Sequence, residues 1–335
     1  MAQSIAQSST AAPTSPPPVD ATKADLRAIA TLCIALMAVS FAPIFIRFSE
    51  TNIGPNATVL NRMLVFFLVF GLGRGLRALW MQWRRSKTPT PETSAADAPL
   101  PITRNQWLLL GSVGLVSATT LGLWAISLEY TTVAKSMLLN NLTPVFASTG
   151  SWLFLGKRFD TRFIAGMAIA VAGAILLGLE DLQGGAADSL LGDGYALLSA
   201  VFLGAYFLLV EQLRSRFGAV TILLCRCAIG SALLIPFVWL TEGTLFPSSW
   251  VGLLAVLGLG IISEGLGQNL LADCMCKFSS SFIALFLLLE PIVSALLSWL
   301  IFAEGLSPIT GVGFVIILGG IYLAKSSNSA VQSGH

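Results

Sequence analysis

The sequence predicts an all-α integral membrane protein with ten transmembrane helices, arranged as two inverted five-helix repeats with both termini in the cytoplasm. Three observations predict this fold class. First, the 335 residues are 55% hydrophobic and only 11% charged, whereas soluble domains carry about 25% charged residues. Second, the apolar runs are long and lack the alternation of strands, so they indicate spanning helices and not a β-barrel. Third, one stretch occurs twice, which indicates an internal repeat.

The apolar runs define the elements in chain order. Residues 1–26 are rich in Ser, Thr, Ala and Pro and predict a disordered N-terminal tail without a cleaved signal peptide. The expected spans are 27–46, 57–76, 106–126, 132–155, 163–179, 192–211, 220–240, 250–272, 280–302 and 309–324. Most approach the roughly 20 residues that cross the hydrocarbon core. A flexible cytoplasmic loop is expected at 77–105, and residues 325–335 form a C-terminal tail.

The doubled stretch runs from Pro144 to Leu177 and again from Pro291 to Ala324, and the copies align without a gap. Each copy has an apolar helix with an early Pro, a short polar turn and a second helix with glycines spaced by seven. The repeats therefore extend over 27–179 and 192–324. An odd number of spans per repeat makes the second copy enter the membrane from the opposite side, so the repeats are inverted, an architecture found in transporters.

The distribution of Lys and Arg sets the orientation. With a cytoplasmic N-terminus, fifteen of the nineteen cationic residues fall on the cytoplasmic side, as the positive-inside rule requires. These are Lys23, Arg27, Arg74, Arg77, Arg84, Arg85, Lys87, Arg104, Lys157, Arg158, Arg162, Arg214, Arg216, Lys277 and Lys325. Arg47 falls on the other side, and the remaining three lie within spans.

These features resemble the drug/metabolite transporter superfamily, in particular its EamA-type ten-helix members. The resemblance rests on Leu-Thr-Pro-Val-Phe at 142–146 and Leu-Glu-Pro-Ile-Val at 289–293, each followed by a polar turn and a Gly-spaced helix. The second copy keeps the family turn as Ala303-Glu304, whereas the first has Gly156-Lys157. The resemblance covers about 27–324. It implies carrier activity, most often export of metabolites or amino acids, and it names no substrate.

Glu264 is the first candidate for a substrate or ion pathway, because a charge at mid-bilayer costs about 2.5–3.5 kcal/mol. It lies in the middle of the eighth span, with Gln268 one turn later on the same face and Asn269 adjacent. A carboxyl that is protonated at rest and titrates during a cycle would serve proton coupling. The structural alternative is a protonated Glu that hydrogen bonds to a neighbouring helix.

Glu290 is the second acidic candidate, and it precedes a proline in the ninth span. Ser294 follows one turn later. The Glu binds a substrate amine or a proton, or it caps the turn that the proline breaks. Four prolines within spans are expected to kink their helices: Pro43, Pro144, Pro236 and Pro291.

Arg62 and Arg226 occupy similar positions in the second and seventh spans. Inversion would place Arg62 near the outer face and Arg226 near the inner face. We therefore expect two gates, in which each Arg pairs with a carboxylate or an anionic substrate. Snorkelling of each guanidinium to the nearest interface is the structural alternative.

Lys135 begins the fourth span and starts a polar stripe. Ser136, Asn140 and Thr143 continue the stripe at helical spacing as far as the following proline. The stripe either lines a cavity or makes interhelical hydrogen bonds. Tyr206 and Trp124 are expected as aromatic walls of the pathway, with packing as the alternative.

These features predict a secondary transporter that exports a small metabolite or amino acid by alternating access, with proton coupling or exchange. A primary pump is disfavoured because the G-x-x-x-x-G-K-[ST] motif is absent from the sequence. A membrane-embedded enzyme acting on lipid is the alternative; it would need convergent carboxylates or a His near one interface, and the single His is His335. A non-transporting sensor or scaffold would bring a soluble output domain.

The expected partners are a small-molecule substrate and membrane lipid, and the chain is a monomer or a homodimer. Nucleic acid is excluded because no basic stripe is interleaved with aromatics. No cofactor or metal is expected, because the two residues of each C-x-C pair point to different sides of a helix. The expected location is a bacterial inner (plasma) membrane.

Overall fold

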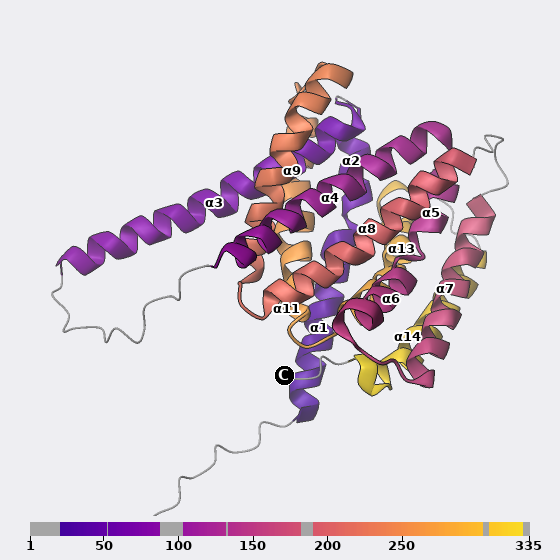
Figure 1. Cartoon of the computed structure of the whole chain (residues 1–335). Helices are drawn as coiled ribbons and strands as arrows, with labels where there is room; N and C mark the ends of the chain where they lie inside the picture. Colours follow the sequence, from indigo (N-terminus) through magenta and orange to yellow (C-terminus); the bar gives the residue numbers. More distant parts are fainter. Residues whose placement is uncertain are drawn as a thin grey trace, which may run out of the picture.

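The structure, a computed structural model, describes residues 21–51, 53–87, 103–131, 133–181, 190–303 and 308–330. These residues form helices joined by short connections (Figure 1). The helices are α1 (Ala21–Ser40), α2 (Ala42–Ser49), α3 (Pro55–Lys87), α4 (Arg104–Tyr130), α5 (Val133–Asn140), α6 (Thr143–Leu155), α7 (Thr161–Asp181), α8 (Leu190–Arg214), α9 (Ala219–Thr241), α10 (Trp250–Gly258), η3 (Leu259–Gln268), α11 (Asn269–Cys274), α12 (Ser280–Phe286), η4 (Leu287–Leu289), α13 (Glu290–Phe302), α14 (Pro308–Lys325) and η5 (Asn328–Ala330).

Over its described residues each predicted span coincides with one or more of these helices, and the fold is that of an all-helical membrane protein. In the described chain, 8 helical segments are long and apolar enough to cross a bilayer. The two other predicted spans are shorter. The helix of 163–179 has an apolar core of Thr161–Leu177, and 132–155 is divided into α5 and α6. The number of crossings therefore stays a prediction.

Three of the four predicted proline kinks coincide with breaks in a helix. Pro43 and Pro144 each lie in the first turn of a new helix, just after an interruption. Pro291 follows the 3-10 turn η4 and stands in the first turn of α13. These positions suit proline because the first turn has N–H groups without helical partners. At Pro236 the structure shows no break, and α9 continues as one helix across it.

The two copies of the doubled stretch end their first helices in the same way. Gly156 caps α6 with φ 64°, and Ala303 caps α13 with φ 54°. The two residues occupy aligned positions of the repeat. The left-handed conformation is easy for glycine but is strained for alanine, whose Cβ approaches a backbone oxygen.

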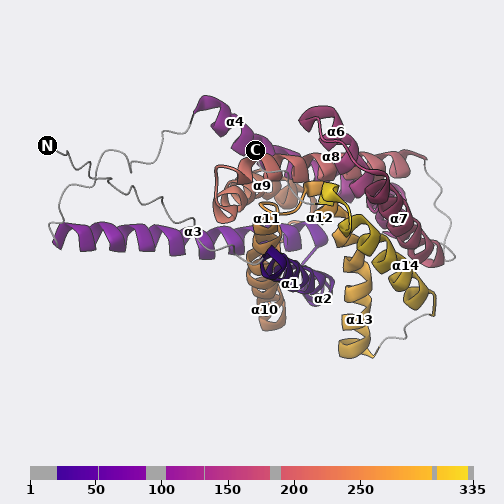
Figure 2. The ribbon, with the colours of Figure 1, turned by 90° about the horizontal axis from the view of Figure 1, so that it is seen from below.

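Helices α7 and α14 pack against each other along most of their length, and both views show them side by side (Figures 1 and 2). Glycines allow the close approach. A Cβ added at Gly166 would lie 2.6 Å from the backbone nitrogen of Ala324, and a Cβ at Gly313 would lie 2.5 Å from the Leu177 side chain. In the aligned repeat Gly166 corresponds to Gly313, and Leu177 corresponds to Ala324. The contact of Gly166 with Ala324 is therefore equivalent to the contact of Gly313 with Leu177 when α7 and α14 are interchanged.

A second pair of contacts at this interface is exchanged in the same way. A Cβ added at Gly320 would lie 2.5 Å from the backbone nitrogen of Ala170, and a Cβ at Gly173 would lie 2.8 Å from the Ile317 side chain. Gly173 aligns with Gly320, and Ala170 aligns with Ile317. Reciprocal contacts of this kind are the signature of two-fold packing.

The two halves of the chain interleave at the centre of the bundle. Helix α4 lies along α8 and α9, and α3 lies along α9 and η3. Helix α1 contacts η3, α11 and α13. The largest buried core includes residues of α1, α4, α7, α8, α12 and α14. This interleaving brings side chains from both halves to a common centre.

The prediction of a flexible loop at 77–105 is wrong in its first part, because α3 continues to Lys87. With 33 residues, the helix is about 50 Å long. Figure 2 shows its distal part projecting away from the bundle. The predicted N-terminal tail is also shorter, because α1 begins at Ala21. Residues 1–20, 88–102 and 331–335, which hold the rest of the predicted tails and loop, lie outside the described residues.

Candidate functional site

A buried carboxyl at the centre of the bundle organises the candidate site. Glu264 has no exposed surface and lies in η3, a π-helix of 10 residues. π-helical turns widen a helix and occur frequently at functional sites. Glycines let neighbouring helices approach η3 closely, since a Cβ at Gly260 would lie 2.4 Å from Val65 and one at Gly267 would lie 2.7 Å from Val39.

Two arginines from different halves of the chain meet this carboxyl. Arg226 of α9 donates a short hydrogen bond from Nη1 to Glu264 Oε1. Arg62 of α3 approaches from the other side, with Nε 3.3 Å from Oε2. This second contact is an ion pair without hydrogen-bond geometry. The Arg side chains are 7% and 16% exposed, respectively.

Each Arg thus pairs with a carboxylate, as expected, but both guanidinium groups share the same one, so this arrangement does not separate them into two gates. A neutral carboxyl would leave two buried guanidinium charges without a counterion, which is costly. With all three groups ionised, the cluster carries one surplus positive charge. We name Arg62, Arg226 and Glu264 the central charge cluster.

A small cavity of about 70 Å³, lined by both polar and apolar side chains, adjoins the central charge cluster. Arg226 lines it and also donates from Nε to Ser117 Oγ at 2.8 Å. Tyr206 is buried against the same guanidinium, 5.2 Å from its ring centroid to Arg226 Cζ. The remaining lining residues include Thr120 and Gln268. The predicted residues Tyr206, Arg226 and Gln268 thus come together, with donors and acceptors suited to a small polar group.

A larger, mainly apolar cavity of about 480 Å³ lies between α3, α4 and α9, and Leu121 lines both cavities. The predicted residue Trp124 lines the larger one, and its Nε1 has no hydrogen-bond partner among the described residues. On each of the three helices, residues at helical spacing lead along one face from the larger cavity toward the central charge cluster. These are Pro55, Val59 and Arg62 of α3; Leu128, Trp124, Leu121 and Ser117 of α4; and Phe237, Leu233 and Arg226 of α9.

Glu290 and Ser294 lie at the break before α13. Ser294 Oγ donates to the carbonyl of Ser40 at 3.0 Å, and Ser40 Oγ donates to the carbonyl of Glu290 at 3.5 Å. These bonds join the break in α13 to the break between α1 and α2. Within the described chain the Glu290 carboxyl has no hydrogen bond or ion pair, although Arg62 acts on it electrostatically at longer range.

The predicted polar stripe of the fourth span makes local and interhelical hydrogen bonds. Ser136 and Ser127 share a hydrogen bond of 2.7 Å, and Thr143 Oγ1 donates to the carbonyl of Asn140 at 2.6 Å. Asn140 and Asn269 each keep a buried Oδ1 without a hydrogen-bond partner among the described residues. Lys135 is half-buried. None of these residues lines the two cavities described above.

The sequence reasoning missed Ser117 and a second buried carboxylate, Glu211. Glu211 of α8 is 2% exposed, forms a short ion pair with Lys157 and accepts a hydrogen bond from the backbone N–H of Ser280 at 3.1 Å. It thereby ties the loop after α6 to the start of α12. In the sequence, Glu211 stands near the end of an apolar helix and is followed closely by Arg214. This pattern is typical of an ordinary helix terminus, so it does not indicate a buried carboxylate.

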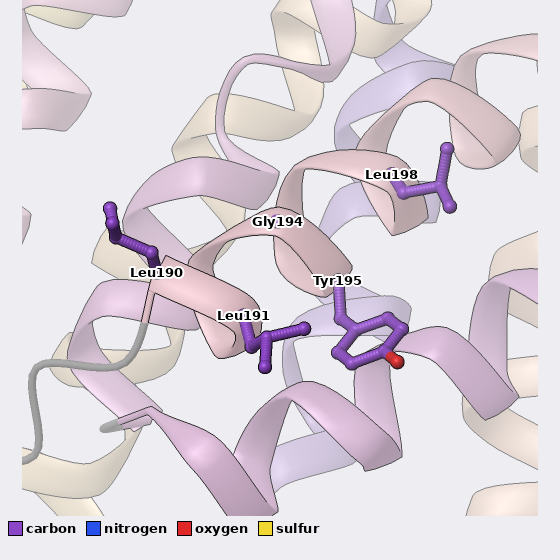
Figure 3. A pocket seen from close by; sticks show the side chains of 5 residues that line it. All are labelled: Leu190, Leu191, Gly194, Tyr195 and Leu198. Carbon is purple, nitrogen blue, oxygen red and sulfur yellow. The ribbon is translucent and has the colours of Figure 1, made fainter.

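A third hollow is a shallow groove on α8, and Figure 3 shows Leu190, Leu191, Tyr195 and Leu198 around it. Its volume is about 350 Å³. The leucines are exposed, and Leu190 reaches 91%. An open leucine-lined surface of this kind suits lipid tails and lacks the convergent polar groups of a substrate site.

The EamA-like transporter family matches this chain over residues 26–179 and 190–325. A transporter of Archaeoglobus fulgidus without a known substrate is 23% identical over 78% of this chain and 86% of its own. A probable terminal-alkyne amino-acid exporter of Streptantibioticus cattleyicolor is 23% identical over 68% of this chain and 77% of its own.

Another relative is the pseudopaline exporter CntI of Pseudomonas aeruginosa, which is 26% identical over 61% of this chain and 70% of its own. Among solved structures, one crystal structure of a protein covers 90% of this chain and 98% of its own, with a TM-score of 0.70 and 18% sequence identity. At that identity the likeness concerns the fold.

Proposed function

Because this chain belongs to the EamA-like transporter family, we propose that it is a secondary transporter that exports a small metabolite bearing a carboxylate, such as an amino acid, by alternating access. The two named relatives are exporters, one of them of an amino acid. The transporter acts in the bacterial inner membrane as a monomer or a homodimer.

The observation that carries the substrate class is the surplus positive charge of the central charge cluster. Arg226 and Arg62 share one carboxylate in a buried site. A carboxylate on a substrate would balance the surplus charge and form charge-assisted hydrogen bonds with a guanidinium. The small cavity beside Arg226 offers room for such a head group, with Ser117, Tyr206 and Gln268 around it.

The larger cavity supplies the route to this site. It opens between α3, α4 and α9, at the helix ends that the charge distribution assigns to the outer side. Its lining is mainly apolar, so it suits the body of a metabolite whose polar head reaches Arg226. Trp124 presents to this route an indole N–H that has no hydrogen-bond partner among the described residues.

Glu264 has the position expected of the coupling residue. When a substrate carboxylate takes its place on Arg226, Glu264 keeps its ion pair with Arg62, so that each guanidinium has one carboxylate. A proton on Glu264 removes one of these two anions, so substrate binding and protonation of Glu264 are coupled. Glu290, which lies at longer range from Arg62, is the second candidate for the proton.

The alternation itself rests on inverted repeats. The reciprocal contacts of α7 and α14 support a two-fold relation between the halves, and α3 and α9, the second helix of each half, contact each other at the centre. In transporters of this architecture one half rocks against the other around a site near the midplane. The cluster draws Arg62 from the first half and Arg226 and Glu264 from the second.

The test begins with a comparison of metabolites inside and outside cells that lack or overproduce the protein. A carboxylate-bearing compound should accumulate inside the former and appear outside the latter. Purified protein in proteoliposomes should then exchange that compound against a pH gradient. Arg226→Gln should abolish exchange, whereas exposed Arg216→Gln should retain it. A transported compound without an acidic group, or full exchange by Arg226→Gln, would overturn the proposal.

A further inference from the structure

The distal part of α3 has two chemically different faces. The helix needs roughly 20 residues to cross about 30 Å of hydrocarbon, a distance that is covered near Arg74 when counted from Pro55. From Leu72 onward an apolar stripe recurs at helical spacing on one side. It consists of Leu72, Leu76, Leu79, Trp80 and Trp83, all exposed by 51–66%.

Arginines flank the apolar stripe of the same segment. Arg74, Arg77 and Arg84 are exposed; helical periodicity places Arg74 on the opposite side, and Arg77 and Arg84 along the edge of the stripe next to Trp80. Arg84 folds over the Trp80 ring, with Cζ 4.1 Å from the ring centroid. We name residues 72–84 the amphipathic arm. Figure 2 shows it extending beyond the bundle, and its apolar stripe is exposed among the described residues.

Glycines mark the junction between the spanning part of α3 and the amphipathic arm. Gly71, Gly73 and Gly75 alternate along the helix, where each weakens it by roughly 1 kcal/mol relative to alanine. Packing does not require them. No atom lies within 4 Å of a Cβ built at Gly73 or Gly75, and a Cβ at Gly71 would make only an ordinary contact of 3.6 Å with Leu224. Helices bend sharply where such residues weaken them.

We propose that α3 bends at these glycines and that the amphipathic arm lies on the leaflet where it emerges, with Leu76, Leu79, Trp80 and Trp83 among the lipid tails and the arginines among anionic headgroups. The partner is an anionic phospholipid surface. Basic amphipathic helices with Trp and Leu on one face bind at this depth of a bilayer. The inference is independent of the transported substrate.

Charge complementarity favours a lipid surface over a second copy of the chain. The arm presents three exposed arginines beside its apolar stripe, so two arms packed together would bring like charges close. Anionic headgroups instead attract each cation, and each Arg near the surface strengthens binding about fivefold, which for three residues amounts to about a hundredfold. Tryptophan is also enriched at the boundary between headgroups and tails.

The experiment measures the depth of the arm in the full-length protein. A nitroxide is attached at Leu79→Cys or at Arg77→Cys, with exposed Cys33 and Cys276 replaced, and the protein is placed in nanodiscs of phosphatidylglycerol. Collisions with oxygen report lipid, and collisions with a soluble nickel chelate report water. Position 79 should collide mainly with oxygen and position 77 mainly with the chelate. Equal exposure of both positions to water would overturn the proposal.

Three controls separate the parts of the inference. In phosphatidylcholine nanodiscs, and in phosphatidylglycerol nanodiscs at high salt, position 79 should become more exposed to the chelate. Changing Arg74 and Arg84 to Gln should have the same effect. Gly73→Ala with Gly75→Ala, for which the structure has space, should lift the arm without unfolding the protein. If position 79 were protected from the nickel chelate equally in charged and uncharged lipid, and its spectrum showed spin–spin broadening, a second copy of the chain would cover the arm. That result would overturn the proposal.

Discussion

Glu264→Gln should destabilise the protein more than the removal of either arginine, because it leaves two buried cations without a counterion. The carboxyl has no exposed surface. At the 3.3 Å between Arg62 Nε and Glu264 Oε2, and at an effective dielectric constant of about 20, the Coulomb attraction alone is about 5 kcal/mol before desolvation. Arg226 adds a second, shorter contact. Removing one partner from a buried ion pair typically costs about 3–5 kcal/mol.

A double-mutant cycle tests this reasoning. Unfolding of Glu264→Gln, Arg226→Gln and the double variant is followed by circular dichroism during titration of mixed micelles with sodium dodecyl sulfate. The double variant should lose less free energy of unfolding than the sum of the single variants, with a coupling of about 2 kcal/mol. Arg62→Gln should cost less than Arg226→Gln because its contact lacks hydrogen-bond geometry. Additive single variants, or a cost below about 1 kcal/mol for Glu264→Gln, would refute a charge-paired cluster.

Other perturbations test features outside the cluster. Gly320→Ala should cost about 1–3 kcal/mol in free energy of unfolding because its Cβ would lie 2.5 Å from backbone atoms of α7, whereas Gly319→Ala, with no atom within 4 Å, should be nearly neutral in the same titration. Ala303→Gly should stabilise the protein by about 0.5–1 kcal/mol by relieving its φ of 54°, and an unchanged midpoint would contradict that strain. Glu211→Gln should lower stability by about 1–3 kcal/mol, because an amide cannot replace the carboxylate between a lysine and a buried backbone N–H; equal stability would show that this tie is dispensable. A hydrogen bond from Ser327 is the largest cause that lowers the pKa of Asp160 below its ordinary value near 3.8, and Phe163 and Ser329 donate further ones. The stabilisation by ionised Asp160 is therefore complete above pH 3.8 and is lost as the pH falls through the lowered pKa. Asp160→Asn should make the free energy of unfolding depend less on pH in the acid range.

The positions of the helices could be predicted from the sequence because each depends on local properties. Hydropathy indicates the apolar runs, and the aligned prolines indicate where helices break. Helices begin at or just before Pro43, Pro144 and Pro291. Helix α9 continues across Pro236, so a proline alone does not decide where a helix breaks.

The convergence of the charged residues could not be predicted in the same way. The sequence located Arg62, Arg226 and Glu264 in their spans, but which side chains meet depends on how three helices cross and on how far each guanidinium reaches. Ser117 was missed because a serine in a helix usually bonds to its own backbone, as Ser112 does with the carbonyl of Leu109. Its role appears only once α4 and α9 are packed together.

The extension of α3 was missed although the sequence contained a signal for it. The basic residues Arg84, Arg85 and Lys87 suggested the start of a cytoplasmic loop. The recurrence of Leu72, Leu76, Leu79 and Trp83 at helical spacing was a competing local pattern, and the structure follows it.

The glycine-mediated contact of α7 and α14 has a consequence for motion. Backbone atoms of one helix lie against backbone atoms of the other, so neither helix can slide or tilt independently without a steric clash. Rotamer changes cannot relieve a clash between backbones. The pair therefore forms a fixed contact between the two halves, so that rocking of one half against the other would pivot here and would move the helices around the charge cluster, where the contacts are made by side chains that can exchange partners.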